Sequence, residues 1–155
     1  GTKGLEHRVG GLEKDNVTGN ISYEPENHEK MVKLRQAKID NIANFIPDLT
    51  CDLQKGEVLV LGWGSTFGAI KVAVDLLKKE GEKVSQVHLR HLNPMPKNLG
   101  EIIKRFDKVL IPELNNGQLI HIIRSKFLVD AKGLHKIKGQ PLYAEEIRKA
   151  VKSML

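Results

Sequence analysis

The chain has 155 residues, of which 40% are hydrophobic and 28% are charged, and this balance is typical of one soluble globular domain with its own core. No apolar stretch approaches the roughly 20 residues that cross a bilayer and no basic head precedes an apolar core, so we expect a cytoplasmic protein without a membrane span or a signal peptide. The formal net charge is +6, but only 5% of the residues are aromatic, too few for stacking on bases along a basic surface, so a nucleic-acid partner is disfavoured.

The first 24 residues resemble an arm more than a packed element. Glycines recur there among charged and polar side chains, with no sustained period of two or 3.6 residues, so we interpret residues 1–24 as an extended arm or linker from a missing upstream domain. The first residue, Gly1, is not methionine, which we interpret as a sign of a fragment or a processed product. Because the arm carries few apolar groups, we expect it to be ordered only where it lies on this domain or on a second copy, through self-association.

Residues 25–50 predict a helix and a connector. Pro25 suits a first helical turn, and helix-forming residues continue to about Asn44. The apolar residues of this segment fall roughly on one side: Met31, Leu34, Ile42 and Phe45. The pattern indicates a helix that packs on another surface, followed by a connector over residues 46–56.

Residues 51–155 alternate between short apolar runs and amphipathic segments. The apolar runs predict strands at 57–62, 83–89, 107–112 and 134–138. The amphipathic segments predict helices at 66–80, 97–106 and 143–154, and one more that opens at 115–117 and turns Leu119, Ile122, Ile123 and Phe127 inward. This order requires a mainly parallel sheet with helices on both faces. Right-handed crossovers make it an α/β fold of the three-layer αβα type.

Polar residues follow three of the predicted strands at their carboxyl ends. In open parallel sheets these ends form the crevice where ligands and partners meet the domain. The candidate crevice residues, for an anion or for a subunit interface, are Gly64, Ser65, Thr66, Arg90, His91, Glu113 and Asn115. We expect the three groups to converge, with Ser65 and Thr66 facing Arg90 at the start of a helix.

The stretch VLVLGWGSTFG, residues 58–68, fits several uses of a strand-to-helix turn. Its G-x-G-x-x-x-G pattern is close to a dinucleotide fingerprint without matching it, and the next strand ends in His88-Leu89-Arg90 where an acidic ribose ligand would be expected. A Walker loop is excluded because no Gly-Lys-Ser/Thr follows, and the glycines do not flank Ser65 as a nucleophile elbow requires. We therefore interpret Ser65 as a helix cap, at a helix start that also suits a weakly bound phosphate.

No catalytic, cofactor-binding or metal-binding residue is predicted in the chain. The single cysteine, Cys51, can form neither an internal disulfide nor a cysteine-ligated cluster. His88 and His91 lie close in sequence, but without a third ligand they favour hydrogen-bonded structure over a metal site. Glu113 has no carboxylate partner at a spacing suited to acid–base chemistry, so it fits a hydrogen bond within the fold or at an interface.

The basic excess of the chain includes a crowded segment. Its cationic residues are Arg124, Lys126, Lys132, Lys136 and Lys138. Such a segment suits an acidic protein or a phosphorylated ligand, and it equally suits a solvated face without a partner. The sequence leaves both interpretations open.

Four segments together resemble one known family. They are SYEPENHEKMVKLRQAKI at 22–39, GWGSTFGA at 62–69, HLRHLNPMP at 88–96 and PELNNGQL at 112–119. In this order, and over nearly the whole chain, they resemble the carboxy-terminal part of the alpha subunit of the 2-oxoacid:ferredoxin oxidoreductases, and most of all those that act on 2-oxoglutarate. GLEH at 4–7 is similar to the linker that leaves the preceding pyrimidine-binding domain in this family, although Arg8-Val9 stands where an acidic pair is commoner.

The resemblance implies a transketolase carboxy-terminal-like domain, with a mixed, mostly parallel sheet of about five strands between helices. It implies a part in converting a 2-oxoacid, CoA and oxidised ferredoxin to an acyl-CoA, CO2 and reduced ferredoxin. The intact complex would carry thiamine diphosphate, magnesium and an iron–sulfur cluster, in upstream domains of this subunit and in a beta subunit that holds the cluster. The chain would then be a non-catalytic structural and subunit-contact domain. The alternatives are an independent nucleotide- or anion-binding α/β domain and a free-standing interaction module.

Overall fold

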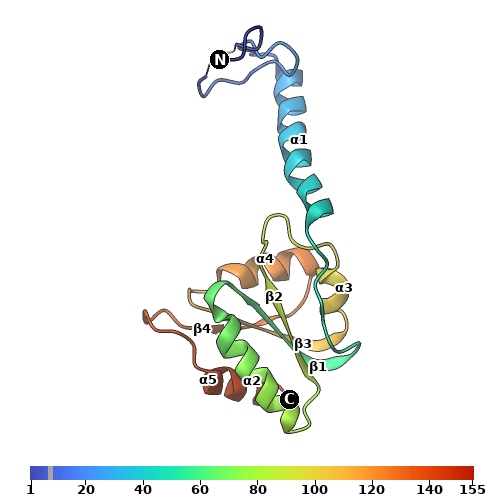
Figure 1. Cartoon of the computed structure of the whole chain (residues 1–155), viewed down its shortest axis with the longest axis vertical. Helices are drawn as coiled ribbons and strands as arrows, with labels where there is room; N and C mark the ends of the chain where they lie inside the picture. Colours follow the sequence, from blue (N-terminus) through green and yellow to red (C-terminus); the bar gives the residue numbers. More distant parts are fainter. Residues whose placement is uncertain (7–8) are drawn as a thin grey trace. The chain divides into compact units, whose positions relative to one another are not determined.

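The computed structural model describes residues 1–6 and 9–155, and it divides the chain into two units, Gly1–Phe45 and Ile46–Leu155 (Figure 1). His7 and Arg8 lie outside the described residues, and with them part of the segment that resembles a family linker. None of the described helices is both long and apolar enough to cross a membrane. All of the candidate crevice residues belong to the second unit.

The second unit is built on one sheet of four strands, and all of its strand pairs are parallel. The strands are β1 (Gly56–Trp63), β2 (Val84–Leu89), β3 (Phe106–Glu113) and β4 (Lys132–His135), in the spatial order β2-β1-β3-β4. The expected mostly parallel sheet is therefore confirmed, with four strands in place of about five and with no antiparallel strand in this sheet. The fifth strand was implied by the family resemblance alone, and no fifth apolar run follows β4, because the chain turns through residues 136–143 into its last helix.

Helices cover both faces of the sheet, which confirms the three-layer αβα fold (Figure 1). The helices are α2 (Phe67–Lys79), α3 (Leu99–Ile103), α4 (Gln118–Phe127) and α5 (Ala144–Lys152). Helices α2 and α5 pack on one face, where Val58 and Val60 of β1 point, and α3 and α4 pack on the other, where Leu59 and Leu61 point. Because both faces are buried, residues 58–61 of β1 form a continuous apolar run without polar alternation.

Two predicted helices differ from the structure in detail. In α4 the buried residues include Ile120, whereas Ile122, which we expected to point inward, is 49% exposed. The helix begins only at Gln118, so Leu119, Ile120 and Ile123 form its inner stripe. Helix α3 is shorter than the predicted segment 97–106, because Phe106 is already the first residue of β3.

The first unit contains α1 (Pro25–Ile42), which has no buried residue, and a hairpin that precedes it. Within residues 1–24, which we expected to form an extended arm or linker, Lys14 and Ile21 form an antiparallel bridge. Asp15 lies in the turn between them, and its Oδ1 accepts hydrogen bonds from the amides of Val17 and Thr18. The turn therefore has its own local hydrogen-bonding chemistry.

One carboxylate attaches this hairpin to α1. Glu13 lies 2.8 Å from Nδ1 of His28 and accepts a hydrogen bond of 3.0 Å from Nη1 of Arg35. These contacts, with that of Arg35 the largest, lower the pKa of Glu13 to about 2. The carboxylate is therefore ionised, and the hairpin held, throughout the neutral pH range.

The glycines of the stretch 58–68 have separate structural reasons. A Cβ atom on Gly62 would overlap Cδ1 of Ile70 and would lie 3.0 Å from Oγ1 of Thr66, so glycine lets α2 approach β1 closely. Gly64 has a φ of 57°, in the left-handed region that glycine adopts without strain. Gly68 faces open space, with nothing within 4 Å of an added Cβ atom. The pattern is therefore explained by chain geometry at two of its three positions.

The change Gly62→Ala should destabilise the domain by about 1–3 kcal/mol, because the new methyl group must displace Ile70 or shift the strand. The matched change Gly68→Ala should leave stability unchanged or raise it by about 0.5–1 kcal/mol, because alanine is the better helix former and has room there. Urea unfolding followed by circular dichroism measures both changes. Equal losses for the two variants would contradict the packing role of Gly62.

Candidate functional site

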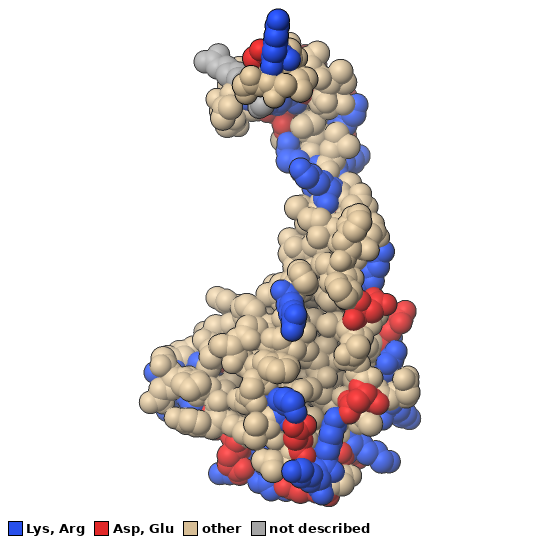
Figure 2. Space-filling view, in the orientation of Figure 1, with Lys and Arg blue, Asp and Glu red and all other residues tan. Residues whose placement is uncertain are grey.

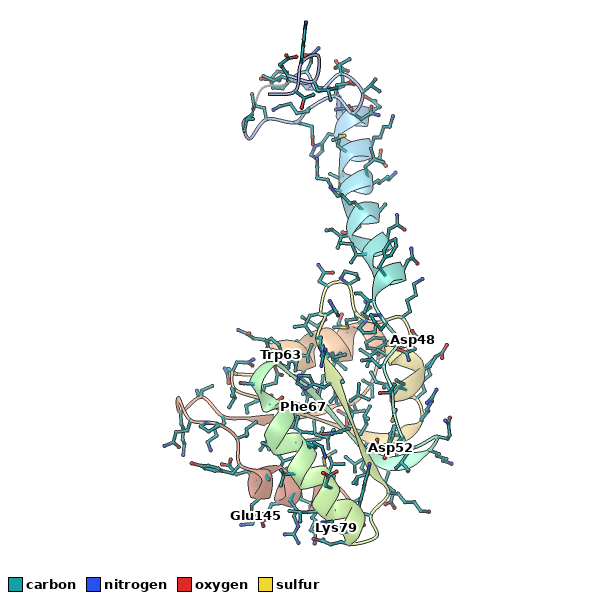
Figure 3. The ribbon with its side chains drawn as sticks, viewed as in Figure 1. Asp48, Asp52, Trp63, Phe67, Lys79 and Glu145 are labelled. Atoms are coloured by element: carbon teal, nitrogen blue, oxygen red, sulfur yellow. The ribbon has the colours of Figure 1, made fainter. Side chains whose placement is uncertain are left out.

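The sheet order places a topological switch point between β1 and β3, because the chain leaves β1 for β2 on one side and returns to β3 on the other. A cavity of about 200 Å³ lies at the carboxyl ends of these two strands. It is lined by Trp63, Gly64, Ser65, Thr66, Leu114 and Asn115. Figure 3 shows Trp63 at the end of β1, with Phe67 at the start of α2 beyond it. This cavity is where an open α/β sheet ordinarily binds a ligand or partner.

The turn from β1 into α2 is held by Thr66 and not by Ser65. Oγ1 of Thr66 accepts a hydrogen bond of 3.2 Å from the amide of Trp63 and donates one of 2.8 Å to the carbonyl oxygen of Trp63. Thr66 is only 4% exposed, whereas Ser65 is exposed. The predicted cap at Ser65 is therefore wrong, because the tight turn at Gly64 points the serine outward and the threonine inward.

Glu113 is the most deeply buried of the candidate residues, at 0% exposure. Its Oε2 accepts a hydrogen bond of 2.8 Å from the amide of Leu119, and its Oε1 accepts one of 3.1 Å from the amide of Ile120. A carboxylate at the positive end of a helix, with both oxygens bonded to backbone donors, is well stabilised even without a cation. The expected role of Glu113 in a hydrogen bond within the fold is the one that the structure shows.

Asn115 completes the same helix start. Its Oδ1 accepts hydrogen bonds of 2.7 Å from the amide of Gly117 and 3.0 Å from the amide of Gln118. Glu113 and Asn115 together therefore bond the four successive amides that open α4. Since those amides are already satisfied, the N-terminus of α4 is closed to an outside anion.

Arg90 and His91 lie in other cavities than Ser65 and Thr66. A cavity of about 450 Å³ is lined by Arg90 together with Phe67, Gln86 and His88, and a cavity of about 320 Å³ contains Arg90 and His91. The three predicted groups therefore do not converge in one cavity. Residues 64–66 and Asn115 line one cavity, and Arg90 and His91 line another. Glu113 is buried beneath the surface.

His88 is the residue of this region that the sequence interpretation used least. Burial, and next the nearby charge of Arg90, lower the pKa of His88 against the opposing effect of a hydrogen bond with the backbone of Gly64. Its ring meets that of Phe67 edge to face, with 5.1 Å between centroids. The lowered pKa favours the neutral imidazole, and among the described residues its buried Nδ1 has no hydrogen-bond partner. The sequence did contain a signal for this residue, because His88 is a polar residue within a strand at the edge of the sheet.

The basic segment 124–138 is largely used inside the domain. Arg124 donates a hydrogen bond of 2.7 Å to the carbonyl oxygen of Ala131, and Lys136, with a side chain only 9% exposed, pairs with Glu146 at 3.0 Å. Figure 2 shows Lys and Arg side chains interspersed with Asp and Glu over the lower part of the second unit, without one continuous basic area on that face. The segment therefore offers less positive charge to a partner than its sequence suggests.

Cys51 belongs to a polar chain between the connector and β2. Its Sγ lies 3.3 Å from Oγ of Ser85, which also donates to Asp52, and Asp52 pairs with Lys78 of α2. Burial raises the pKa of Asp52, but the hydrogen bonds from Lys78 and Ser85 outweigh it and lower the pKa overall. Among the residues described, no group of three or more His, Cys, Asp or Glu side chains is placed to hold a metal ion. The thiol therefore takes part in fixing the connector.

Residues 56–152, more than half of the chain, match the family model described as pyruvate:ferredoxin oxidoreductase core domain II. The chain belongs to this family. Over its whole length it is 51% identical to the 2-oxoglutarate oxidoreductase subunit KorA of Mycobacterium tuberculosis, of which it spans 24%. It is 32% identical, over 95% of its length, to the alpha subunit of 2-oxoacid:ferredoxin oxidoreductase 2 of Aeropyrum pernix, of which it also spans 24%.

Solved structures agree with these sequence relatives. The 2-oxoglutarate:ferredoxin oxidoreductase from Magnetococcus marinus, with 2-oxoglutarate, coenzyme A and succinyl-CoA bound, matches 99% of this chain with a TM-score of 0.91 and 32% identity, over 27% of that chain. A split-gene transketolase matches 68% of this chain and 41% of its own with a TM-score of 0.54 and 19% identity, which shows a shared fold. The resemblance to the alpha subunit of the 2-oxoacid:ferredoxin oxidoreductases is confirmed. The chain spans about a quarter of the length of its curated relatives.

The change Thr66→Val should destabilise the domain by about 1–3 kcal/mol, because it keeps the shape of the side chain but leaves the amide and carbonyl of Trp63 without their partner. Ser65→Ala, one residue away, should stay within about 0.5 kcal/mol, as is usual for an exposed side chain. Scanning calorimetry measures the melting temperature of both variants, which should shift by about 2–4 °C for each kcal/mol in a chain of this size. A larger loss for Ser65→Ala than for Thr66→Val would contradict the role of Thr66 in holding this turn.

Proposed function

We propose that this chain is the structural and subunit-contact domain of the alpha subunit of a 2-oxoglutarate:ferredoxin oxidoreductase, and that the bond-making chemistry takes place elsewhere in the complex. The observation that carries this proposal is the burial of Glu113. Its carboxylate is bonded to the amides of Leu119 and Ile120 and is not presented to a substrate. Thr66 and Asn115 are likewise used to hold the turns at which they stand.

The reaction of the whole complex would convert 2-oxoglutarate, CoA and oxidised ferredoxin to succinyl-CoA, CO2 and reduced ferredoxin. Thiamine diphosphate, with magnesium, supplies the decarboxylation of a 2-oxoacid, and an iron–sulfur cluster supplies the electron path to ferredoxin. The donor set of this chain does not fit such a cluster, since its one cysteine is already in contact with Ser85. We assign the thiamine to upstream domains of this subunit and the cluster to the beta subunit. The partners of the domain are then those domains and that subunit, while ferredoxin is a partner of the complex.

The second candidate function is weak anion binding at the start of α2. The structure favours it in one respect: Thr66 is the N-cap of this helix, and no side chain in the described part of the chain caps its first amides. The cavity lined by Gly64, Ser65 and Thr66 adjoins them. An independent nucleotide- or anion-binding domain would use this helix start.

Phosphate should bind there with a dissociation constant in the millimolar range, as is typical of a small anion on a few amides. Titration of inorganic phosphate, followed by amide shifts in NMR, measures it, and the amides of Gly64 to Phe67 should move. The amides of Gly117 to Ile120 serve as the control, because Asn115 and Glu113 already occupy them. No movement at Gly64 to Phe67 would remove the anion site.

Replacement of Glu113 by alanine in the intact complex should reduce assembly or stability before it alters the chemical step. The expected loss of stability is about 1–3 kcal/mol, because two buried amides lose their acceptor. Gel filtration measures assembly, and the turnover rate per assembled complex is measured with 2-oxoglutarate, CoA and a viologen acceptor. Glu101→Ala, at an exposed position of α3, is the control and should change neither. A Glu113→Ala complex that assembles normally but has lost its turnover would overturn the proposal.

A further inference from the structure

The strand β2 forms one outer edge of the sheet. It pairs only with β1, so the backbone groups on its other side are left without a strand partner. The connector 46–55 runs nearby, but among the described residues no backbone–backbone hydrogen bond joins it to β2. An edge of this kind is the part of a sheet that accepts a further strand.

A cavity of about 450 Å³ lies along this edge. Three successive residues of β2 line it: Gln86, Val87 and His88. Because successive side chains of a strand point to opposite faces, a cavity that borders three in a row lies beside the backbone edge and not over one face. The open backbone groups of β2 therefore border an empty volume of a size that holds a ligand.

The opposite wall of this cavity is fixed in place. Leu49, which lines it, accepts a hydrogen bond of 2.8 Å from Nδ2 of Asn98 and donates one of 3.0 Å to Oδ1 of Asn98. Further along the connector, Asp52 is held by Ser85 and by Lys78. The two attachments hold the connector beside β2 on both sides of Thr50. The cavity of about 450 Å³ between them, which we call the groove, therefore exists before a ligand arrives.

The groove carries an unused positive charge. Arg90 is exposed, and in the part of the chain that the structure describes it makes no ion pair and no side-chain hydrogen bond. It lines both the cavity of about 450 Å³ and the adjoining cavity of about 320 Å³. Asp48 also lines the second cavity, but no ion pair joins it to Arg90. The ring of Phe67, 48% exposed, adds an apolar surface to the first cavity (Figure 3).

We propose that an extended, acidic polypeptide segment docks along the outer edge of β2 as an added strand, with a carboxylate on Arg90 and an aliphatic side chain against Phe67. A polypeptide is favoured over a small anion because the cavity borders strand backbone, which offers alternate donors and acceptors that an inorganic anion would not match. An acidic segment is favoured because Arg90, which lines this cavity, is a cation without a partner among the described residues. The inference goes beyond a contact domain in general, since it names the edge and the chemistry of what binds there.

The probe is the blocked peptide acetyl-Asp-Val-Asp-Val-amide, titrated into the whole 155-residue chain and followed by amide shifts in NMR. The peptide should shift the amides of residues 86–90 with a dissociation constant in the millimolar range. Two further peptides have the same sequence but carry N-methyl groups on alternate backbone nitrogens. In one peptide the first and third nitrogens are methylated, and in the other the second and fourth. One of these two should fail to bind, because it has lost the donors that face β2. The basic peptide acetyl-Lys-Val-Lys-Val-amide should also fail.

The variant Arg90→Gln should weaken binding of the acidic peptide about tenfold, the usual effect of losing one charged hydrogen bond. The control Lys79→Gln removes a positive charge from the far end of α2, about 18 Å along the helix from Phe67, and should leave the affinity unchanged. Strand addition is overturned if residues 86–90 do not shift, or if both N-methylated peptides bind as well as the plain one. It is also overturned if inorganic phosphate shifts the same amides and displaces the peptide, which would make the groove an anion site. These experiments use the chain alone. If the peptide does not bind, the proposed role of the domain in the complex is unaffected, because that role is tested separately by Glu113→Ala in the intact complex.

Discussion

The buried carboxylate of Glu113 is the interaction on which the rest of this domain depends. It stands at the last residue of β3, a central strand of the sheet, and bonds the amides of Leu119 and Ile120 in α4. The main-chain oxygen of the same residue accepts a hydrogen bond of 3.0 Å from the amide of Lys136, just beyond β4. One residue therefore joins a central strand, the helix that covers it and the turn that follows the edge strand. A carboxyl side chain at 0% exposure is tolerated there because both of its oxygens accept hydrogen bonds from backbone amides in place of water.

This arrangement explains why the polar residues at the strand ends need not be catalytic. In an open parallel sheet, polar side chains at this edge ordinarily serve a ligand. Here Thr66 bonds the backbone of Trp63, Asn115 bonds the amides of Gly117 and Gln118, and Glu113 bonds the next two. The basic segment is also used within the domain: Lys136 forms an ion pair with Glu146, and its Nζ lies 4.3 Å from the ring centroid of Tyr143. Polar groups that are used for turns and caps in this way are not available to a substrate.

The two edges of the sheet differ in the length of the edge strand and in what lies beside it. The edge strand β4 has only four residues, and its exposed positions include Lys132 and His135, which discourages pairing with another strand. The other edge strand, β2, has six residues and borders the cavity with Arg90. The polar chain from Lys78 through Asp52 to Ser85 keeps the connector beside that edge without bonding its backbone. Protected and open edges thus occur in the same sheet.

The sequence by itself determined the alternation of strands and helices, and with it the three-layer fold. Short apolar runs such as that of β1, alternating with amphipathic segments, indicate strands that are buried between two layers of helices. The family was likewise indicated by motifs such as PELNNGQL, whose Glu113 and Asn115 prove to cap α4. Sequence did not distinguish Ser65 from Thr66, because either hydroxyl suits a cap and only the turn at Gly64 decides which of them points inward. Nor did it separate Arg90 from the cavity of Gly64 to Thr66, since which strand ends share a cavity depends on how the loops pack. Strand order, burial of Glu113 and the open edge of β2 are long-range properties, which no local pattern of residues encodes.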